Sequence, residues 1–319
     1  MVSLEEAGHP LAKAARQEVD LIENAPVPDT TRGYTQLELD ATVQLVGGVT
    51  VRFGKDGSIM QLDRRGVEWA SESKRLGAFT YKTLNDSDWM PFTYSYLKNN
   101  APSPGFWKPG SNEWSESTIF RPTATALHVN AAKTSVVVQM EMPARSTEKY
   151  GSWKIVHLEL SVDTAKPSEL DLTYTTLSKG IASIGESTSI TFQPAPQLKS
   201  PTRDASAWSI DKLGHSIDPE GVVDGGNQFN HASWGGTKVN TVAGSMTIRS
   251  LDAPNVNPMT EMFPIGNPLP ASIDQELSKS GKGMSQLTKG SVIGMATNLH
   301  NNLWNTSELV GLVTLCEIA

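Results

Sequence analysis

The sequence has almost no cysteine, no long apolar run and no cluster of basic residues. Cys316 is its one cysteine in 319 residues, so an internal disulfide framework is excluded. Its longest apolar run is far shorter than the roughly 20 residues that a membrane-spanning helix needs. Acidic residues outnumber basic ones by 34 to 27, and the net charge is −7. We therefore expect neither nucleic acid nor an anionic membrane as a partner.

The N-terminal sequence leaves the compartment open. Residues 1–9 lack the basic segment and apolar core that mark a signal peptide. As written, the chain is expected in the cytoplasm, or outside the cell if it is a fragment of a longer secreted protein. The sequons at Asn85 and Asn305 allow the second location, although such short motifs also arise by chance.

Hydrophobic periodicity predicts one helix followed by many strands. Apolar residues between positions 3 and 24 lie near one helical face, most clearly from Pro10 to Asn24. From Tyr34 onward the period changes to two, and alternation covers residues 37–45, 49–53, 59–62, 135–142, 153–163, 168–176, 187–193 and 237–251. Many short strands separated by turns rich in Gly, Pro and Asp favour an antiparallel β-sandwich.

Long segments without a regular pattern separate these strands at residues 85–117, 194–236 and 252–297. The first is rich in aromatic residues, so we expect it to be ordered and packed on a sheet. The second contains the stretch 208–232, which combines aromatic, acidic, amide and imidazole groups with glycines. Polar loops of this kind usually serve recognition or catalysis.

The common catalytic and metal-binding motifs are absent. Residues 180–187 have the spacing of a phosphate-binding loop, but Glu186 occupies the lysine position and would repel phosphate. No Gly-x-Ser-x-Gly, His-Glu-x-x-His or Cys-x-x-Cys motif occurs. We therefore expect no metal and no cofactor.

The remaining titratable residues leave two interpretations open. His128 and His157 fall in strand-like alternation, whereas His215, His231 and His300 fall in polar loops. An acid and a base for sugar chemistry are available among Asp211, Asp218, Glu220 and Asp224. Residues 218–221 also read as an ordinary turn, which is the interpretation we favour. Trp208 and Trp234 either stack on a sugar or close one end of the sandwich.

Several motifs carry a resemblance to a known family. They are Gly77-x-Phe79-x-Tyr81-x-Thr83, Trp208–Gly214, Ile217–Pro219, Gly226–Asn227, His231–Ala232, Ser250–Pro254 and Asn298–Thr306. In this order they resemble an uncharacterised family, catalogued as a domain of unknown function, that is related to the α-mannosidases of glycoside hydrolase family 38.

The resemblance implies that the chain corresponds to the C-terminal half of such a protein. That half is a mainly β, large antiparallel super-sandwich of the galactose-mutarotase type, here with a short N-terminal helix. The implied division is a helical remnant and linker at 1–30, the super-sandwich at 31–306 and an atypical tail at 307–319. Because the tail and residues 183–192 depart from the family pattern, we also expect a truncated or mispredicted gene product.

The leading hypothesis is thus a carbohydrate-related sandwich that lacks the catalytic barrel and is inactive alone. Its expected partners are a carbohydrate and a missing N-terminal catalytic domain. The residues expected to contact carbohydrate are Asn227, His231, Trp234, His300, Asn301 and Trp304. Two alternatives stay open. One is a non-catalytic carbohydrate-binding protein. The other is a self-standing epimerase or polysaccharide lyase that pairs His231 or His300 with Glu113, Glu116 or Asp211.

Overall fold

A computed structural model describes residues 8–23, 29–96, 114–166, 168–202, 205–223, 226–269, 287–303 and 316–318. The chain divides into two compact units, residues 1–32 and 33–319. Helix α2 (Ala12–Glu23) belongs to the first unit and confirms the helix expected from Pro10 to Asn24. In the part of the chain that the structure describes, no helix has the length and apolar character needed to span a membrane.

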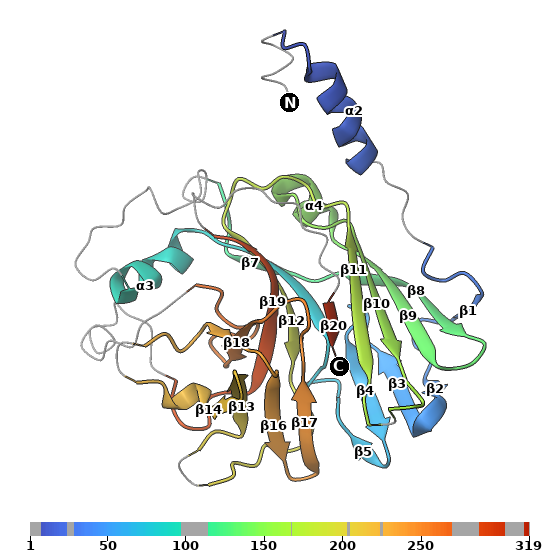
Figure 1. The fold of residues 1–319 in the computed structure, drawn as a ribbon, viewed down its shortest axis with the longest axis vertical. Helices are drawn as coiled ribbons and strands as arrows, with labels where there is room; N and C mark the ends of the chain where they lie inside the picture. Colours follow the sequence, from blue (N-terminus) through green and yellow to red (C-terminus); the bar gives the residue numbers. More distant parts are fainter. Residues whose placement is uncertain are drawn as a thin grey trace. The chain divides into compact units, whose positions relative to one another are not determined.

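The second unit is built mainly of antiparallel strands, which the described residues arrange in four sheets (Figure 1). Sheet A has six strands, in the order β1 (Tyr34–Leu37), β8 (Thr123–Asn130), β9 (Ser135–Glu141), β10 (Ile155–Ser161), β11 (Asp171–Leu177) and β20 (Cys316–Ile318). Sheet B has four, in the order β2 (Val43–Leu45), β3 (Val49–Phe53), β4 (Ile59–Arg64) and β5 (Val67–Glu68).

The other two sheets contain most of the C-terminal half of the chain. Sheet C has six strands, in the order β15 (His231–Ala232), β18 (Asn255–Met259), β19 (Gly294–Asn302), β12 (Glu186–Phe192), β6 (Ala78–Thr83) and β7 (Thr118–Phe120). Sheet D has four, in the order β14 (His215–Ile217), β13 (Trp208–Lys212), β16 (Thr237–Thr241) and β17 (Gly244–Ile248). The expectation of a mainly β, antiparallel chain with few helices is confirmed.

Alternating side chains explain how sheet A packs on sheet C. On β11, Leu172, Tyr174 and Thr176 are buried while their neighbours are half-buried. The ring of Tyr174 stacks on Phe79 of β6 with centroids 6.3 Å apart, and its hydroxyl donates to the Gly77 carbonyl at 2.5 Å. Strand β12 is buried at every position, as expected for a strand covered on both faces.

The predicted strand over residues 37–45 is wrong in one respect. The chain turns after Leu37, where the Ala41 amide donates to the Glu38 carbonyl at 3.0 Å, and resumes as β2 at Val43. The two halves therefore enter different sheets, β1 in sheet A and β2 in sheet B. A uniform alternation cannot reveal this change of sheet, because each half keeps the same period.

Residues 85–117 contain a helix that periodicity did not predict, α3 (Asp86–Tyr96). At its start the Asn85 side chain accepts from the Ser87 amide at 3.0 Å, and the Asp88 carboxylate accepts from the Asn85 amide at 3.0 Å. This reciprocal arrangement is a capping box. Trp89 and Phe92 pack into a small separate core with Leu84, Leu269 and Leu303. Residues 97–113 lie outside the described residues.

Candidate functional site

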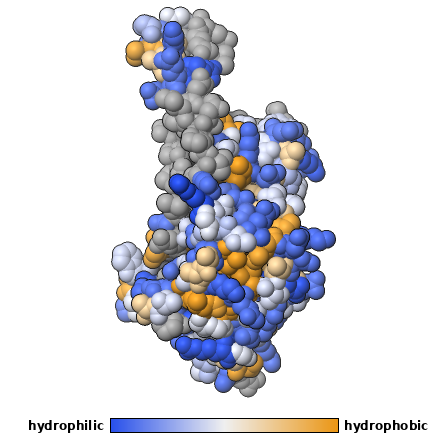
Figure 2. All heavy atoms as spheres, turned by 90° about the vertical axis from the view of Figure 1, so that its right-hand side faces the viewer, coloured by the Kyte–Doolittle hydropathy of each residue, from blue (hydrophilic) through white to orange (hydrophobic). Residues whose placement is uncertain are grey.

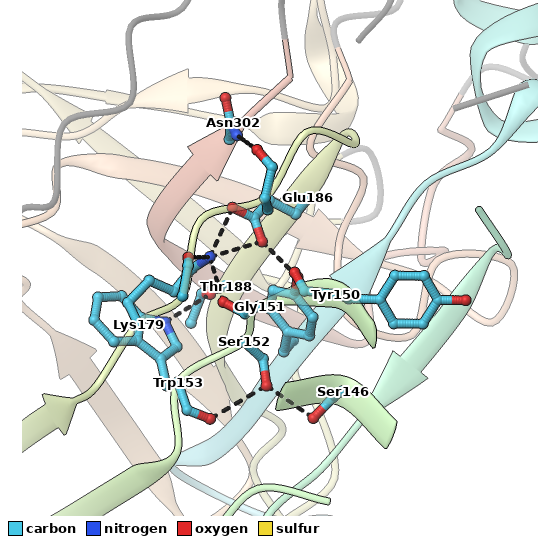
Figure 3. A network of polar contacts seen from close by, with 12 residues as sticks. Ser146, Tyr150, Gly151, Ser152, Trp153, Lys179, Glu186, Thr188 and Asn302 are labelled. Atoms are coloured by element: carbon cyan, nitrogen blue, oxygen red, sulfur yellow. Dashed lines mark hydrogen bonds and ion pairs between the residues drawn. The ribbon is translucent and has the colours of Figure 1, made fainter. Parts of the chain in front are cut away.

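A buried ion pair lies where the chain passes from β11 to β12. Lys179 Nζ lies 2.9 Å and 3.0 Å from the two carboxylate oxygens of Glu186 (Figure 3). Only 1% of the Glu186 side chain and 12% of the Lys179 side chain are exposed. Burying two charges costs several kcal/mol per ion unless their remaining hydrogen-bonding groups are also satisfied.

Here the neighbouring groups satisfy both charges. Lys179 Nζ also donates to the carbonyls of Gly151 at 2.8 Å and Gly180 at 3.1 Å, so its protons are all directed at acceptors. The hydroxyl of Tyr81, on β6, donates to Glu186 Oε2 and lies 3.0 Å from the Tyr150 carbonyl. Burial, and then the charge of Glu186, raises the pKa of Tyr81, so this residue remains a hydrogen-bond donor.

Two glycines allow the backbone carbonyls to reach Lys179. Gly151 ends helix α4 (Ala144–Tyr150) with φ of +68°, in the left-handed region. A Cβ on Gly151 would lie 2.7 Å from the Ile181 carbonyl oxygen, and one on Gly180 would lie 3.0 Å from the Gly151 Cα. A larger residue at either position would push the two segments apart. The close approach of these two segments therefore depends on glycine at both positions.

His300 lies beside this cluster on β19. It is opposite Thr188 in the register, and its ring centroid lies 6.1 Å from that of Trp153 in an edge-on arrangement. The Trp153 indole donates to the Thr188 hydroxyl at 3.2 Å. Burial lowers the pKa of His300, while Glu186 acts to raise it and Lys179 to lower it. The imidazole is thus neutral near pH 7. Within the described residues, its Nδ1 is buried without a hydrogen-bond partner.

An aromatic pair lies on the α4 side of the cluster. Trp114 is 41% exposed and stacks nearly parallel on Tyr150, with centroids 5.8 Å apart and an interplanar angle of 6°. The Tyr150 ring in turn contacts Phe120. One indole therefore has a rigid aromatic support and a partly open surface, which is the character of residues that bind ligands by stacking.

The residues predicted to contact carbohydrate fall into two groups. His300 and Asn301 lie on β19, and Asn301 is exposed with its side-chain amide 3.3 Å from the Asn298 side-chain oxygen. His231 lies on edge strand β15, with β18 between it and β19. Strand spacing and rise place His231 and His300 on the order of 14 Å apart. Trp304 lies outside the described residues.

The group on residues 227–234 is engaged mostly with the backbone. The Asn227 side chain accepts from the Phe229 amide at 3.0 Å, an Asx turn. His231 is 2% exposed, and its Nε2 lies 2.9 Å from the Gln228 carbonyl oxygen. Burial lowers its pKa to about 4. Trp234, in contrast, is 78% exposed.

The candidate carboxylates near residue 218 are occupied as well. Asp218 accepts from the Glu220 amide at 2.8 Å at the start of a short 3-10 helix, which confirms the turn interpretation. Glu220 is buried and accepts from the amides of Gly290 and Val292 at 3.0 Å and 2.9 Å. Burial opposes ionisation of Asp218, yet Lys289 and two amide groups lower its pKa.

The acid–base pairs expected for a self-standing enzyme are not found among the described residues. Asp211 accepts from the amides of Gly214 and Gly235 at 3.1 Å and 3.2 Å. Glu116 forms ion pairs with Arg145 and Lys149. Glu113 and Asp224 lie outside the described residues. Among those described, no group of three or more His, Cys, Asp or Glu is arranged to hold a metal ion.

Sequence reasoning did not identify the residues that form the cluster. Lys179, Tyr81 and Trp153 were not singled out for a site, and Glu186 was considered only as the residue that disqualifies a phosphate loop. Tyr81 and Glu186 are 105 positions apart, so only the pairing of β6 with β12 brings them together. The available signal was a charged residue at each end of an otherwise uncharged segment, Lys179–Glu186.

These features define a mainly antiparallel β-sandwich protein with a buried, fully paired charge cluster at one end of sheet C. The model of a family described as a domain of unknown function, DUF5054, matches residues 3–171, more than half of the chain. The chain belongs to this family, which confirms the expected membership of a family of unknown function.

The other comparisons concern solved structures and curated proteins. The chain is similar to the crystal structure of a putative aldose 1-epimerase from Escherichia coli K12, with a TM-score of 0.39 and 11% identity, over 90% of this chain and 98% of that chain. A TM-score this low implies nothing about activity. No curated protein matches the chain.

Replacing Lys179 by Met should destabilise the protein by about 3–5 kcal/mol, because the carboxyl group of Glu186 would stay buried without its ion-pair partner. The double variant Lys179→Met/Glu186→Gln should lose clearly less than the sum of the two single losses. Urea unfolding of the wild type, the single variants Lys179→Met and Glu186→Gln, and the double variant measures these losses of stability. Arg145→Met, which removes one partner of exposed Glu116, is the matched control and should change stability little. Additive single losses would show that the two side chains do not interact.

His231 should make stability depend on pH. The pKa of this imidazole is about 4 in the folded protein and 6.5 ordinarily, so the unfolded chain binds the proton more readily between these values. The contribution is fully present above pH 6.5 and is lost as pH falls toward 4, by roughly 3 kcal/mol. His231→Gln should therefore lose less stability than the wild type over this range in urea unfolding. His215→Gln, at an exposed position, should follow the wild-type curve. Identical slopes for His231→Gln and the wild type would contradict the assignment.

Proposed function

We propose that the chain is a carbohydrate-associated β-sandwich without catalytic activity of its own, corresponding to the C-terminal half of a protein related to glycoside hydrolase family 38. One observation carries the proposal: Glu186, whose charge acts on His300, has its oxygens engaged by Lys179 and Tyr81. A carboxylate held in this way is a poor acid or base, because each proton transfer would leave a buried charge without its partner.

The requirements of sugar hydrolysis support the absence of catalysis. Canonical glycoside hydrolysis needs two carboxyl groups on either side of the scissile bond. In the described part of the chain, Asp211, Asp218 and Glu220 each accept hydrogen bonds from backbone amides that shape turns or loops. Their positions are therefore explained by folding, and we assign catalysis to a separate domain.

The aromatic surroundings of the cluster support a carbohydrate as the ligand. Trp114 presents a partly exposed indole supported by Tyr150, and Asn301 offers an exposed amide. Sugar ligands combine apolar ring faces with hydroxyl groups, so an aromatic surface beside amides suits both properties. Asn227, His231, Trp234, His300, Asn301 and Trp304 remain our proposed contacts, with Trp114 as an addition.

Surface character supports a protein partner for the β unit. Figure 2 shows hydrophobic residues gathered on one face of a mainly hydrophilic surface, the face that lies to the right in Figure 1. Contiguous apolar surface of this kind often marks an interface. We propose the catalytic domain as the part that covers it.

The purified chain should show no turnover of aryl glycosides, including α-mannosides, and should not accelerate the mutarotation of aldoses followed by polarimetry. It should still bind sugar in a glycan array followed by calorimetry, and Trp114→Ala should weaken that binding at least tenfold. The stacking contribution lost with the indole is the physical reason.

The variants distinguish the alternatives. Turnover that disappears in His300→Ala would contradict the proposal and support a self-standing epimerase. Trp234→Ala removes the other exposed indole among the proposed contacts and tests the 227–234 loop separately. Binding lost in Trp234→Ala but kept in Trp114→Ala would move the sugar to the 227–234 loop. The absence of any sugar binding by the wild type would overturn the carbohydrate assignment.

A further inference from the structure

A cavity lies away from the charge cluster. It has a volume of about 530 Å³ and is lined mainly by β4 and β5 of sheet B, residues 168–172 and strand β17 of sheet D. Cavities of roughly 300–1,000 Å³ accommodate small organic ligands. None of Lys179, Glu186, Tyr81 or His300 lines it, so it is distinct from the site described above.

The inner wall of this cavity is apolar. Leu62, Leu172 and Ile248 are buried there, and Trp69 and Met246 are half-buried. Trp69 is fixed by its backbone, since its amide donates to the Leu62 carbonyl at 2.8 Å and its carbonyl accepts from the Ala195 amide at 2.8 Å. The wall is therefore a preformed surface that favours an apolar ligand body.

The rim is positively charged although the chain as a whole is acidic. Arg64, Arg65 and Arg249 line the cavity, and Glu169 is the one carboxylate among the lining residues. Glu169 lies 3.5 Å from Lys166, which offsets its charge. Arg64 donates to the Ser168 carbonyl at 3.0 Å, which holds its guanidinium at the rim. Within the described residues, Arg65 and Arg249 form no ion pair.

Arg64 and Arg65 sit together at an electrostatic cost. Burial lowers the pKa of Arg64, and the neighbouring charge of Arg65 lowers it further. Arg65 adopts a left-handed backbone conformation with φ of +55°, which a residue with a side chain rarely takes. An anion bound at the rim would offset the repulsion between the guanidinium groups.

We propose that this cavity binds a small amphipathic anion, a molecule with an apolar acyl or aryl body and one acidic head group. The body lies against Leu62, Trp69, Leu172 and Met246, and the head group meets Arg64, Arg65 and Arg249. Each guanidinium can form paired hydrogen bonds with a carboxylate or sulfonate, whereas a neutral head group gains no charge-assisted bond there. This inference is independent of the carbohydrate proposal.

The test uses 1-anilinonaphthalene-8-sulfonate, an aryl sulfonate whose fluorescence rises in apolar sites, with the purified full chain. We expect saturable binding at one site, with energy transfer from tryptophan to the dye that falls in Trp69→Phe. Arg65→Gln/Arg249→Gln should weaken binding at least tenfold, because charge-assisted bonds are lost at exposed positions that the fold does not need. Decanoate should displace the dye, and decanol at the same concentration should not.

Two further variants make the outcome decisive. Val67→Trp, on the short strand β5, fills the cavity from its edge and should abolish binding while thermal unfolding remains cooperative. Arg121→Gln removes an exposed arginine that does not line the cavity and should bind the dye as the wild type does. Unchanged binding in both Val67→Trp and the double arginine variant would overturn the proposal, as would displacement by decanol equal to that by decanoate.

Discussion

The pairing of Lys179 with Glu186 is the interaction on which one end of the sandwich depends. Glu186 is the first residue of β12, a strand buried along its whole length, and a lone carboxylate there would be strongly destabilising. Lys179 neutralises it and also ties down the carbonyls of Gly151 and Gly180. Tyr81 extends the network to β6. A single desolvated pair thus joins sheet C, the end of α4 and the loop before β12.

The charge cluster and the cavity beside β5 differ in how their charges are compensated. In the cluster, each charge is met by a partner within the described chain, so binding a ligand there brings no large electrostatic gain. In the cavity beside β5, Arg65 and Arg249 lie at exposed positions and form no ion pair within the described residues, so an anionic ligand can form charge-assisted hydrogen bonds with them. The charge balance therefore favours an anionic ligand at the cavity and not at the cluster.

How much of the fold and of the candidate site the sequence could predict depends on how far apart in the sequence the contacting residues are. Strands such as β9, β10 and β16 were predictable because the apolar pattern of a strand is local in the sequence, and in β16 the buried positions alternate with exposed or half-buried ones. Helix α3 was missed because the apolar residues of 86–96 show no clear helical period in the sequence and Pro91 falls in the middle of the segment. Its capping box, Asn85 followed by Asp88, was a usable local signal. The whole cluster could not be predicted, since Tyr81 meets Glu186 only through the pairing of β6 with β12, and His300 is placed beside them only through the pairing of β12 with β19.

The histidines show why residue type alone does not locate a site. His231 and His300 stand in similar polar motifs. His231 is held against the Gln228 carbonyl on an edge strand, whereas His300 packs edge-on to Trp153 and is influenced by the charges of Glu186 and Lys179. Burial lowers the pKa of both, so both are neutral near pH 7 and neither contributes a fixed positive charge. The difference between them lies in their neighbours. If sugar binds beside His300, specificity must come from the aromatic and amide groups around the imidazole, because the nearby charges already compensate one another.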